Sequence, residues 1–329
     1  MDTERMFLTD EGFSLTYEEL LENDLEVARH FIEVTRHLQE IHYLFLIFIN
    51  NIDKLQKEYV LMNNGDVFYR ERAANDESDY ISINSYIINI ISAGRTLVES
   101  MECYINSNLN IDDEAKNKYL DFYHKTYDSS FSYRLLIRLR DYSQHGHLPV
   151  SSMQNNYRFD LSQIVDKPHY NHNKTFENQM KNIIDEIRTK YHDTPTIALT
   201  DTLAEYVVQL LSIHKMFWHQ IQGELSEAYD RFQIVVSNYS DNIIKEHGAL
   251  AGYFVYDVID GNVQVVDPKG DSREMCSRFK KEAVDRYDEY AKSYKEVLSG
   301  NLFIRCSDGQ ISIESGEKFA CRAIGRCES

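Results

Sequence analysis

The clearest pattern in the chain is an apolar stripe that begins at Val27. Its members recur at alternating steps of four and three residues, the spacing of one helix face: Val27, Phe31, Val34, Leu38, Ile41, Phe45, Phe48, Ile52, Leu55 and Tyr59. A second stripe consists of Ile83, Ile87, Ile90, Gly94, Leu97, Met101 and Tyr104. Asn63-Asn64-Gly65-Asp66 ends the first helix, and the polar stretch to Asp79 predicts a solvated connection. We therefore expect two long antiparallel helices in a bundle, with Gly94 allowing a neighbouring backbone to come close.

Four further helices are predicted before residue 240. The third begins with Asp112-Asp113-Glu114 and extends to about Tyr127, because acidic residues favour a helix N-terminus. The fourth begins after a cap at Ser129 or Ser130 and ends at Gly146, with Pro149 as a stop signal. Apolar spacing predicts a fifth helix from Phe176 to Tyr191 and a long sixth helix after Thr200. Tyr157 to Val165 is predicted to be a short extended segment.

The pattern changes after about residue 240. Tyr253 to Ile259 and Val263 to Val266 flank Asp260-Gly261, a strong hairpin signal. Leu302 to Cys306 and Ile311 to Ile313 flank Asp308-Gly309 in the same way, and Ser272 to Leu298 between the two hairpins has helical spacing. The expected fold is mainly α: a helical domain at 1–240 with a small α+β module, hairpin, helix, hairpin, at 241–329.

Composition supports the mainly helical expectation. Only 4 prolines and 13 glycines occur in 329 residues, which favours long uninterrupted helices. The net charge of −18 repels nucleic acid and anionic membranes over the molecule as a whole, so an RNA site has to be a local basic island. No apolar run is long enough for a membrane span, and no signal peptide is recognised. Five cysteines without a C-x-x-C pair fit reduced thiols. We expect a soluble cytoplasmic protein.

The fourth predicted helix carries residue types that suggest a chemistry. Arg134, Arg138 and Arg140 lie among leucines and isoleucine, and Asp141 follows Arg140 directly. His145 stands five residues after Arg140 at the helix end. An arginine can bind a phosphate with two parallel hydrogen bonds, and a histidine can transfer a proton near neutral pH. RNA cleavage needs both functions. An exposed arginine face and a histidine that caps the helix are the structural alternatives.

Arg140-Asp141-Tyr142-Ser143-Gln144-His145 resembles the R-x4-6-H motif of HEPN domains. In this family of helical bundles the residue after the arginine is typically Asn, Asp or His. The resemblance implies a HEPN-like bundle over roughly residues 15–240 and a metal-independent endoribonuclease without a cofactor. It also implies a homodimer in which both motifs face one cleft, and a role as a toxin or antiviral defence effector. An antitoxin or nucleotidyltransferase is the implied protein partner, and the C-terminal module lies outside the resemblance.

Carried onto this chain, the resemblance implies that His145 is the general acid or base and Arg140 holds the phosphate. Asp141 would orient Arg140 or shape the cleft. Arg138 remains an alternative, because seven residues make about two helical turns and place Arg138 on the face of His145. Arg138, Arg134, Tyr142 and His147 are the candidate substrate-binding residues. A solvated loop position for His147 and a half-buried position for Tyr142 are the structural alternatives.

Two other functions stay open. A catalytically silent HEPN-like protein that binds a protein or nucleotide is the main alternative. A metal site formed from His145, His147, His169 and His172 is a weaker one, since no carboxylate or cysteine stands at a ligand spacing among them. His214, Trp218 and His219 lie on an apolar helix and are predicted to be core or dimer-surface residues. Cys321 and Cys327 flank a mildly basic tail for which no role is assigned.

Overall fold

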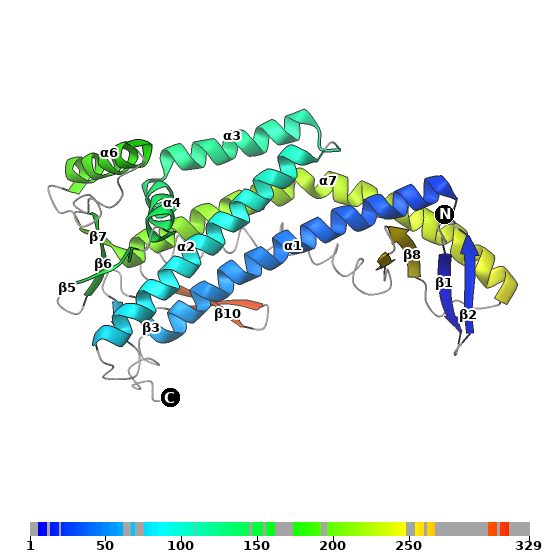
Figure 1. Ribbon diagram of the computed structural model, residues 1–329, viewed down its shortest axis with the longest axis horizontal. Helices are drawn as coiled ribbons and strands as arrows, with labels where there is room; N and C mark the ends of the chain where they lie inside the picture. Colours follow the sequence, from blue (N-terminus) through cyan, green and yellow to red (C-terminus); the bar gives the residue numbers. More distant parts are fainter. Residues whose placement is uncertain are drawn as a thin grey trace.

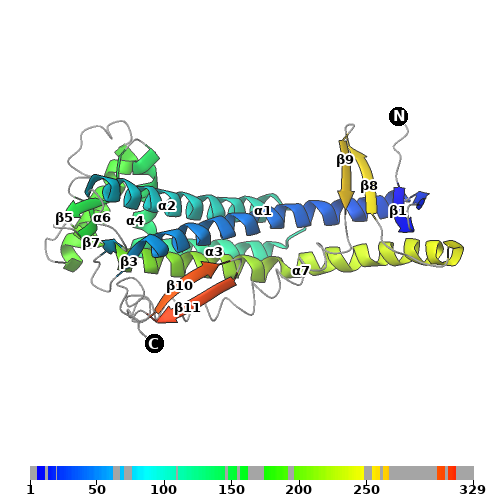
Figure 2. The same ribbon diagram turned by 90° about the horizontal axis from the view of Figure 1, so that it is seen from below.

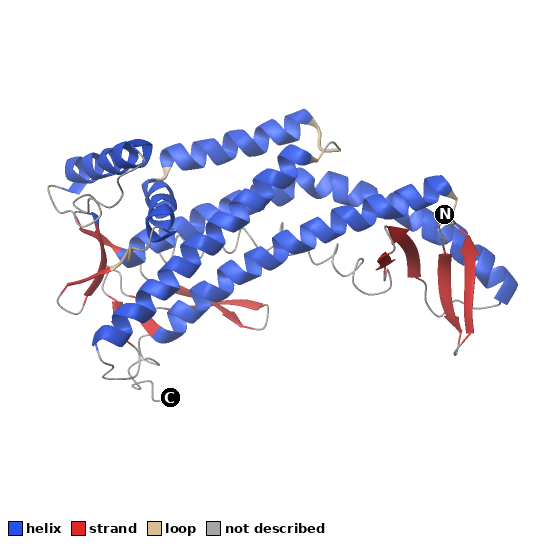
Figure 3. Ribbon diagram, viewed as in Figure 1, coloured by secondary structure: helices blue, strands red, loops and turns tan. Residues whose placement is uncertain are grey.

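The computed structural model describes residues 6–11, 14–19, 21–61, 67–69, 76–108, 110–144, 147–153, 156–161, 174–191, 196–247, 254–259, 262–266, 302–307 and 310–315. Within them the protein is mainly helical (Figure 3). The helices are α1 (Glu22–Glu58), α2 (Asp76–Ser107), α3 (Asp113–Ser129), α4 (Phe131–Gln144), α6 (Lys174–Tyr191) and α7 (Leu199–His247). None of these helices holds a stretch that is both long and apolar enough to span a membrane.

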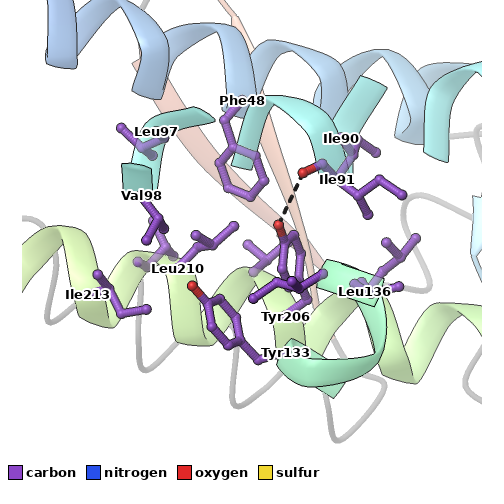
Figure 4. Close-up of a cluster of buried hydrophobic side chains, with 14 of the residues drawn as sticks. Phe48, Ile90, Ile91, Leu97, Val98, Tyr133, Leu136, Tyr206, Leu210 and Ile213 are labelled. Carbon is purple, nitrogen blue, oxygen red and sulfur yellow. Dashed lines mark hydrogen bonds between the residues drawn. The ribbon is translucent and has the colours of Figure 1, made fainter. Parts of the chain in front are cut away.

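Three long helices form the body of the molecule. α1 and α2 are antiparallel neighbours, and α7 packs along both of them (Figure 1). Eight positions of the first stripe, Phe31 to Leu55, and all seven of the second are buried, which confirms the predicted helix faces. α3 packs back along α7, and α4 fills the space between α2 and α7. The main core therefore lies among α1, α2, α4 and α7 (Figure 4).

α1 and α7 continue together beyond the end of α2 and form a two-helix arm (Figures 1 and 2). A second, smaller core holds this arm: Leu25, Ala28, Phe31, Ala228, Phe232, Val235, Val236 and Tyr239. Phe31 and Phe232 stack with ring centroids 4.6 Å apart. Tyr239 Oη donates to Asp24 Oδ2 at 2.8 Å and accepts from the Leu21 amide at 2.8 Å, so the arm is also closed by hydrogen bonds.

The strands form small antiparallel sheets around the helices. They are β1 (Met6–Glu11), β2 (Ser14–Glu19), β3 (Tyr59–Leu61), β4 (Val67–Tyr69), β5 (Ser151–Met153), β6 (Asn156–Asp160), β7 (Thr196–Ala198), β8 (Phe254–Ile259), β9 (Asn262–Val266), β10 (Leu302–Ser307) and β11 (Gln310–Ser315). The sheet orders are β2-β1-β8-β9, β10-β11, β3-β4 and β5-β6-β7. Both hairpins predicted from Asp-Gly turns are present, as β8-β9 and β10-β11.

Several predicted boundaries differ from the structure. The first helix ends at Glu58, so Tyr59 begins β3, and β4 lies within the stretch predicted to be a solvated connection. The predicted strand near Tyr157 is β6, and the sixth helix extends to His247 rather than to about 240. The β1-β2 hairpin was not predicted. The predicted helix at 272–298 lies outside the described residues.

Candidate functional site

α4 carries the three arginines, and its N-terminus is fixed by polar contacts. The Ser130 hydroxyl accepts from the Tyr133 amide at 3.2 Å, so Ser130 is the cap. The hydroxyls of Ser130 and Ser132 donate to the carboxylate of Glu205 on α7 at 2.8 and 2.6 Å. A carboxylate at this end of a helix is stabilised by the helix dipole. α4 is therefore held against α7 at a defined position.

The guanidinium of Arg134 joins three helices. It donates to both carboxylate oxygens of Glu186 on α6, at 3.0 and 2.7 Å, and to the backbone carbonyl oxygens of Tyr127 and Asp128 on α3. Its donors are occupied by the protein itself. These contacts give Arg134 a structural role in place of the substrate contact that the sequence suggested.

Arg138 and Arg140 converge on one carboxylate. Nη1 of Arg138 lies 3.4 Å from Asp141 Oδ2, and Nη1 of Arg140 lies 3.5 Å from Asp141 Oδ1. Asp141 thus lies between two guanidinium groups, one from each arginine. We call Arg138, Arg140 and Asp141 the arginine cluster. The helical geometry that separated Arg138 from Arg140 by face does not separate them at this carboxylate.

The arginine cluster is only partly open to solvent. The side chains of Arg138, Arg140 and Asp141 are 19%, 23% and 32% exposed. Arg138 also donates to the Tyr127 hydroxyl at 2.9 Å. The amide of Gln144, with its oxygen turned toward Arg140, accepts from Nε and Nη2 at 3.2 Å. An exposed arginine face, the structural alternative considered from the sequence, is therefore not what α4 presents.

The residues after α4 return to the body of the protein. His145 lies outside the described residues. The Tyr142 ring is 1% exposed and lies 5.0 Å from the half-buried ring of His147. Burial raises the pKa of Tyr142 to about 12, so its hydroxyl is neutral at physiological pH. A buried Tyr142 does not offer a face to an RNA base, and His147 packs on it rather than standing in a solvated loop.

Asn84 of α2 is a positioning residue that the sequence reasoning missed. Its side chain is 1% exposed, accepts from the Val150 amide at 2.9 Å and donates to the Val150 carbonyl at 3.3 Å. The side-chain amide thus pairs with both backbone groups of one residue. An asparagine next to Ile83 of the apolar stripe was the available signal, since a buried amide requires partners.

The site consists of two guanidinium groups, from Arg138 and Arg140, and the carboxylate of Asp141. Two guanidiniums near one another favour binding of a phosphate that bridges them. No group of three or more histidines, cysteines or acids suited to a metal ion occurs among the described side chains. His214 and Trp218 lie in the core, whereas His219 is exposed.

No protein-family model, curated protein or solved structure matches this chain.

Proposed function

We propose that this protein is a metal-independent endoribonuclease of the HEPN type, with its site at the C-terminal end of α4. The observation that supports the proposal most is the convergence of Arg138 and Arg140 on Asp141, which stands four residues before His145 in the sequence. A pair of guanidiniums at one point provides a local positive site in a chain of net charge −18.

In the proposed reaction the 2′-hydroxyl of a ribose attacks the adjacent phosphate. His145 removes the hydroxyl proton, or returns a proton to the departing 5′-oxygen. A bond forms between O2′ and phosphorus while the bond to O5′ breaks, which leaves a 2′,3′-cyclic phosphate and a 5′-hydroxyl. Arg140 stabilises the negative charge that develops on the phosphate oxygens, and Arg138 is the second phosphate contact. Asp141 holds both guanidiniums in place before substrate binds.

Partial burial makes the arginine cluster suited to this task. With about a fifth of each arginine side chain exposed, the side chains remain accessible while the surrounding protein lowers the local dielectric. The proposal includes a homodimer, so that two clusters and two copies of His145 act on one RNA, and a defence or toxin role with an antitoxin partner. These parts rest on the resemblance of the six-residue motif.

The decisive experiment is cleavage of single-stranded RNA in the presence of EDTA. We expect wild type to cut, and both His145→Ala and Arg140→Ala to reduce the rate by about 100-fold or more, the usual contribution of an acid–base group or a charge-stabilising donor. Arg188→Ala is the matched control, because Arg188 is an exposed arginine on α6 that pairs with Asp185 at 3.8 Å. Arg138→Ala measures which arginine belongs to the motif.

Equal cleavage by wild type and by His145→Ala would exclude the proposed mechanism, and loss of cleavage in EDTA would point to metal-dependent chemistry. A catalytically silent binding protein is the second candidate. The bond from Arg138 to the Tyr127 hydroxyl favours it, because this bond gives Arg138 a structural task like that of Arg134. That function predicts RNA or protein binding without cleavage, and circular dichroism of each variant establishes that it is folded.

A further inference from the structure

A polar pocket lies at the corner where α2 ends against α1, at the beginning of the two-helix arm. Its walls include His30, Glu33 and His37 on one face of α1, and Tyr104 and Asn108 at the C-terminal end of α2. The cavity volume is about 240 Å³. A single water occupies about 30 Å³ of liquid, so this pocket has room for a ligand of several heavy atoms.

Glu224 of α7 accepts hydrogen bonds from two of these lining residues, Tyr104 and Asn108. The Tyr104 hydroxyl donates to Glu224 Oε2 at 3.2 Å, and Asn108 Nδ2 donates to Oε1 at 2.7 Å. Burial raises the pKa of Glu224, while these hydrogen bonds and nearby His30 act in the opposite direction. Neither Glu224 nor Glu33 forms an ion pair with a lysine or arginine within the described part of the chain.

The electrostatics of this corner favour a positive ligand. The last turn of α2 directs its carbonyl ends toward the corner, and the C-terminal end of a helix carries partial negative charge. Two carboxylates that pair with no lysine or arginine among the described residues add to that field, in a chain of net charge −18. An anion is disfavoured by the same charges. The Tyr104 ring, whose centroid is 6.3 Å from that of His37, adds an aromatic wall on which a cation can rest.

We propose that this pocket binds a small organic cation, a short aliphatic amine or diamine, with its ammonium group at Glu33 and the carbonyl end of α2, its methylenes along Tyr104, and the charge of Glu224 acting from behind Tyr104 and Asn108. A bare metal ion fits the pocket less well, because the described residues there include no group of three or more metal-ligating side chains. An ammonium group needs only oxygen acceptors, which Glu33 and the α2 carbonyl ends supply.

The pocket is remote from the arginine cluster. The charge of Arg140 reaches Tyr206 on α7, and Glu224 lies further along that helix, about 27 Å away at 1.5 Å per residue. The proposal therefore does not rest on ribonuclease activity.

Isothermal titration calorimetry of the full chain with putrescine tests it. We expect saturable 1:1 binding with a Kd below about 1 mM. Glu224→Gln keeps an acceptor oxygen for Asn108 and offers an NH2 group from which the Tyr104 hydroxyl can accept, but it removes the charge, and should weaken binding about 10-fold or more. Glu227→Gln is the matched control, since Glu227 is an exposed acid on the same helix that pairs with Arg231 at 2.6 Å, and it should bind as wild type.

Butane-1,4-diol has the length of putrescine without its charge and should give no heat of binding. The proposal is overturned if putrescine does not bind wild type up to about 20 mM or if the diol binds as well as putrescine. It is also overturned if Glu224→Gln and Glu227→Gln bind putrescine with the same affinity. Glu33→Gln is a second test of the proposal if Glu224→Gln does not fold. The Glu33 side chain is exposed and does not support the core, so this variant should fold. Unchanged putrescine affinity in that variant would then count against the proposal.

Discussion

His214 of α7 is an example of a titratable side chain that packing has made part of the core. Its ring is 1% exposed and stacks on Phe45 of α1 with centroids 4.2 Å apart, and its Nε2 accepts from Trp218 Nε1 at 2.9 Å. Burial lowers the pKa of His214 well below the ordinary value, and the nearby charge of His42 lowers it further. The neutral imidazole is therefore the folded form.

This arrangement predicts a specific pH dependence of stability. The unfolded chain binds a proton at His214 near pH 6.5 and the folded chain does not, so its contribution is fully present above that pH and is lost as pH falls below it. We expect the free energy of unfolding of wild type to fall between pH 7 and 5.5 more steeply than that of His214→Gln, by up to about 1.4 kcal/mol per pH unit. The glutamine oxygen still accepts from Trp218. Urea titrations at several pH values measure the slopes, and equal slopes in both proteins would contradict the assignment.

Individual side chains show where sequence reasoning reached its limit on the candidate site. Arg134, Arg138 and Arg140 were recognised as a group, but their partners Glu186, Tyr127 and Asp141 decide what each one does. Glu186 lies on a different helix and far along the chain from Arg134, so no local pattern indicates the pair. Tyr142 was predicted to bind substrate. It is buried because α4 packs against both α2 and α7, and the sequence of α4 alone does not show which of its faces these helices cover.

Among the helices, the close approach of α2 and α7 depends on Gly94. A Cβ atom built at Gly94 would lie 2.5 Å from the Tyr206 hydroxyl and 2.6 Å from Leu210 Cδ1. The Tyr206 hydroxyl also donates to the Ile91 carbonyl at 3.4 Å (Figure 4). Sequence spacing predicted that Gly94 faces the core and admits a neighbour. The neighbour consists of side chains of α7 instead of the backbone that was expected.

Gly94→Ala should destabilise the protein although alanine is the better helix former. The overpacking against Tyr206 and Leu210 costs about 1–3 kcal/mol, whereas the helix propensity of alanine gains about 1 kcal/mol. The expected net effect is a loss of stability of up to about 2 kcal/mol. Gly223→Ala on α7 is the matched control, since its Cβ would meet nothing within 4 Å. It should raise stability by about 0.5–1 kcal/mol. Thermal and urea unfolding of both variants give the comparison, and a gain in stability at Gly94 would mean that α2 and α7 are further apart.

The helices were predicted well because their signal is local. A repeat of apolar residues at steps of four and three defines a helix and its buried face without reference to any other segment. The β1-β2 hairpin lacks such a signal, because it gains its partner from β8, which follows all six described helices in the chain. A two-stranded hairpin alone is marginally stable, so pairing with β8 and β9 is what supports it.

The N-terminal hairpin and the β8-β9 hairpin share the sheet β2-β1-β8-β9, beside the arm of α1 and α7 (Figure 2). Residues 241–329 were expected to form a module of their own. In the structure β8 pairs with β1 in the register Met6 to Tyr256, Phe7 to Val255 and Leu8 to Phe254, whereas β10 packs on α1. The two hairpins of the expected module thus have different partners, the N-terminal strand β1 and the helix α1.

This register predicts that an engineered disulfide can connect the N-terminal hairpin to β8. Opposite residues of antiparallel strands have Cα atoms about 4.5–5.5 Å apart, within the range of about 4.4–6.8 Å that a disulfide spans. Phe7→Cys with Val255→Cys should therefore cross-link on mild oxidation in most molecules, and peptide mass mapping before and after reduction identifies the bond. Phe7→Cys with Val258→Cys is the control, because Val258 lies three residues further along β8, about 10 Å away. Equal cross-linking in both pairs would indicate a mobile module that meets the N-terminus by chance, and no cross-linking in either would place β8 away from β1.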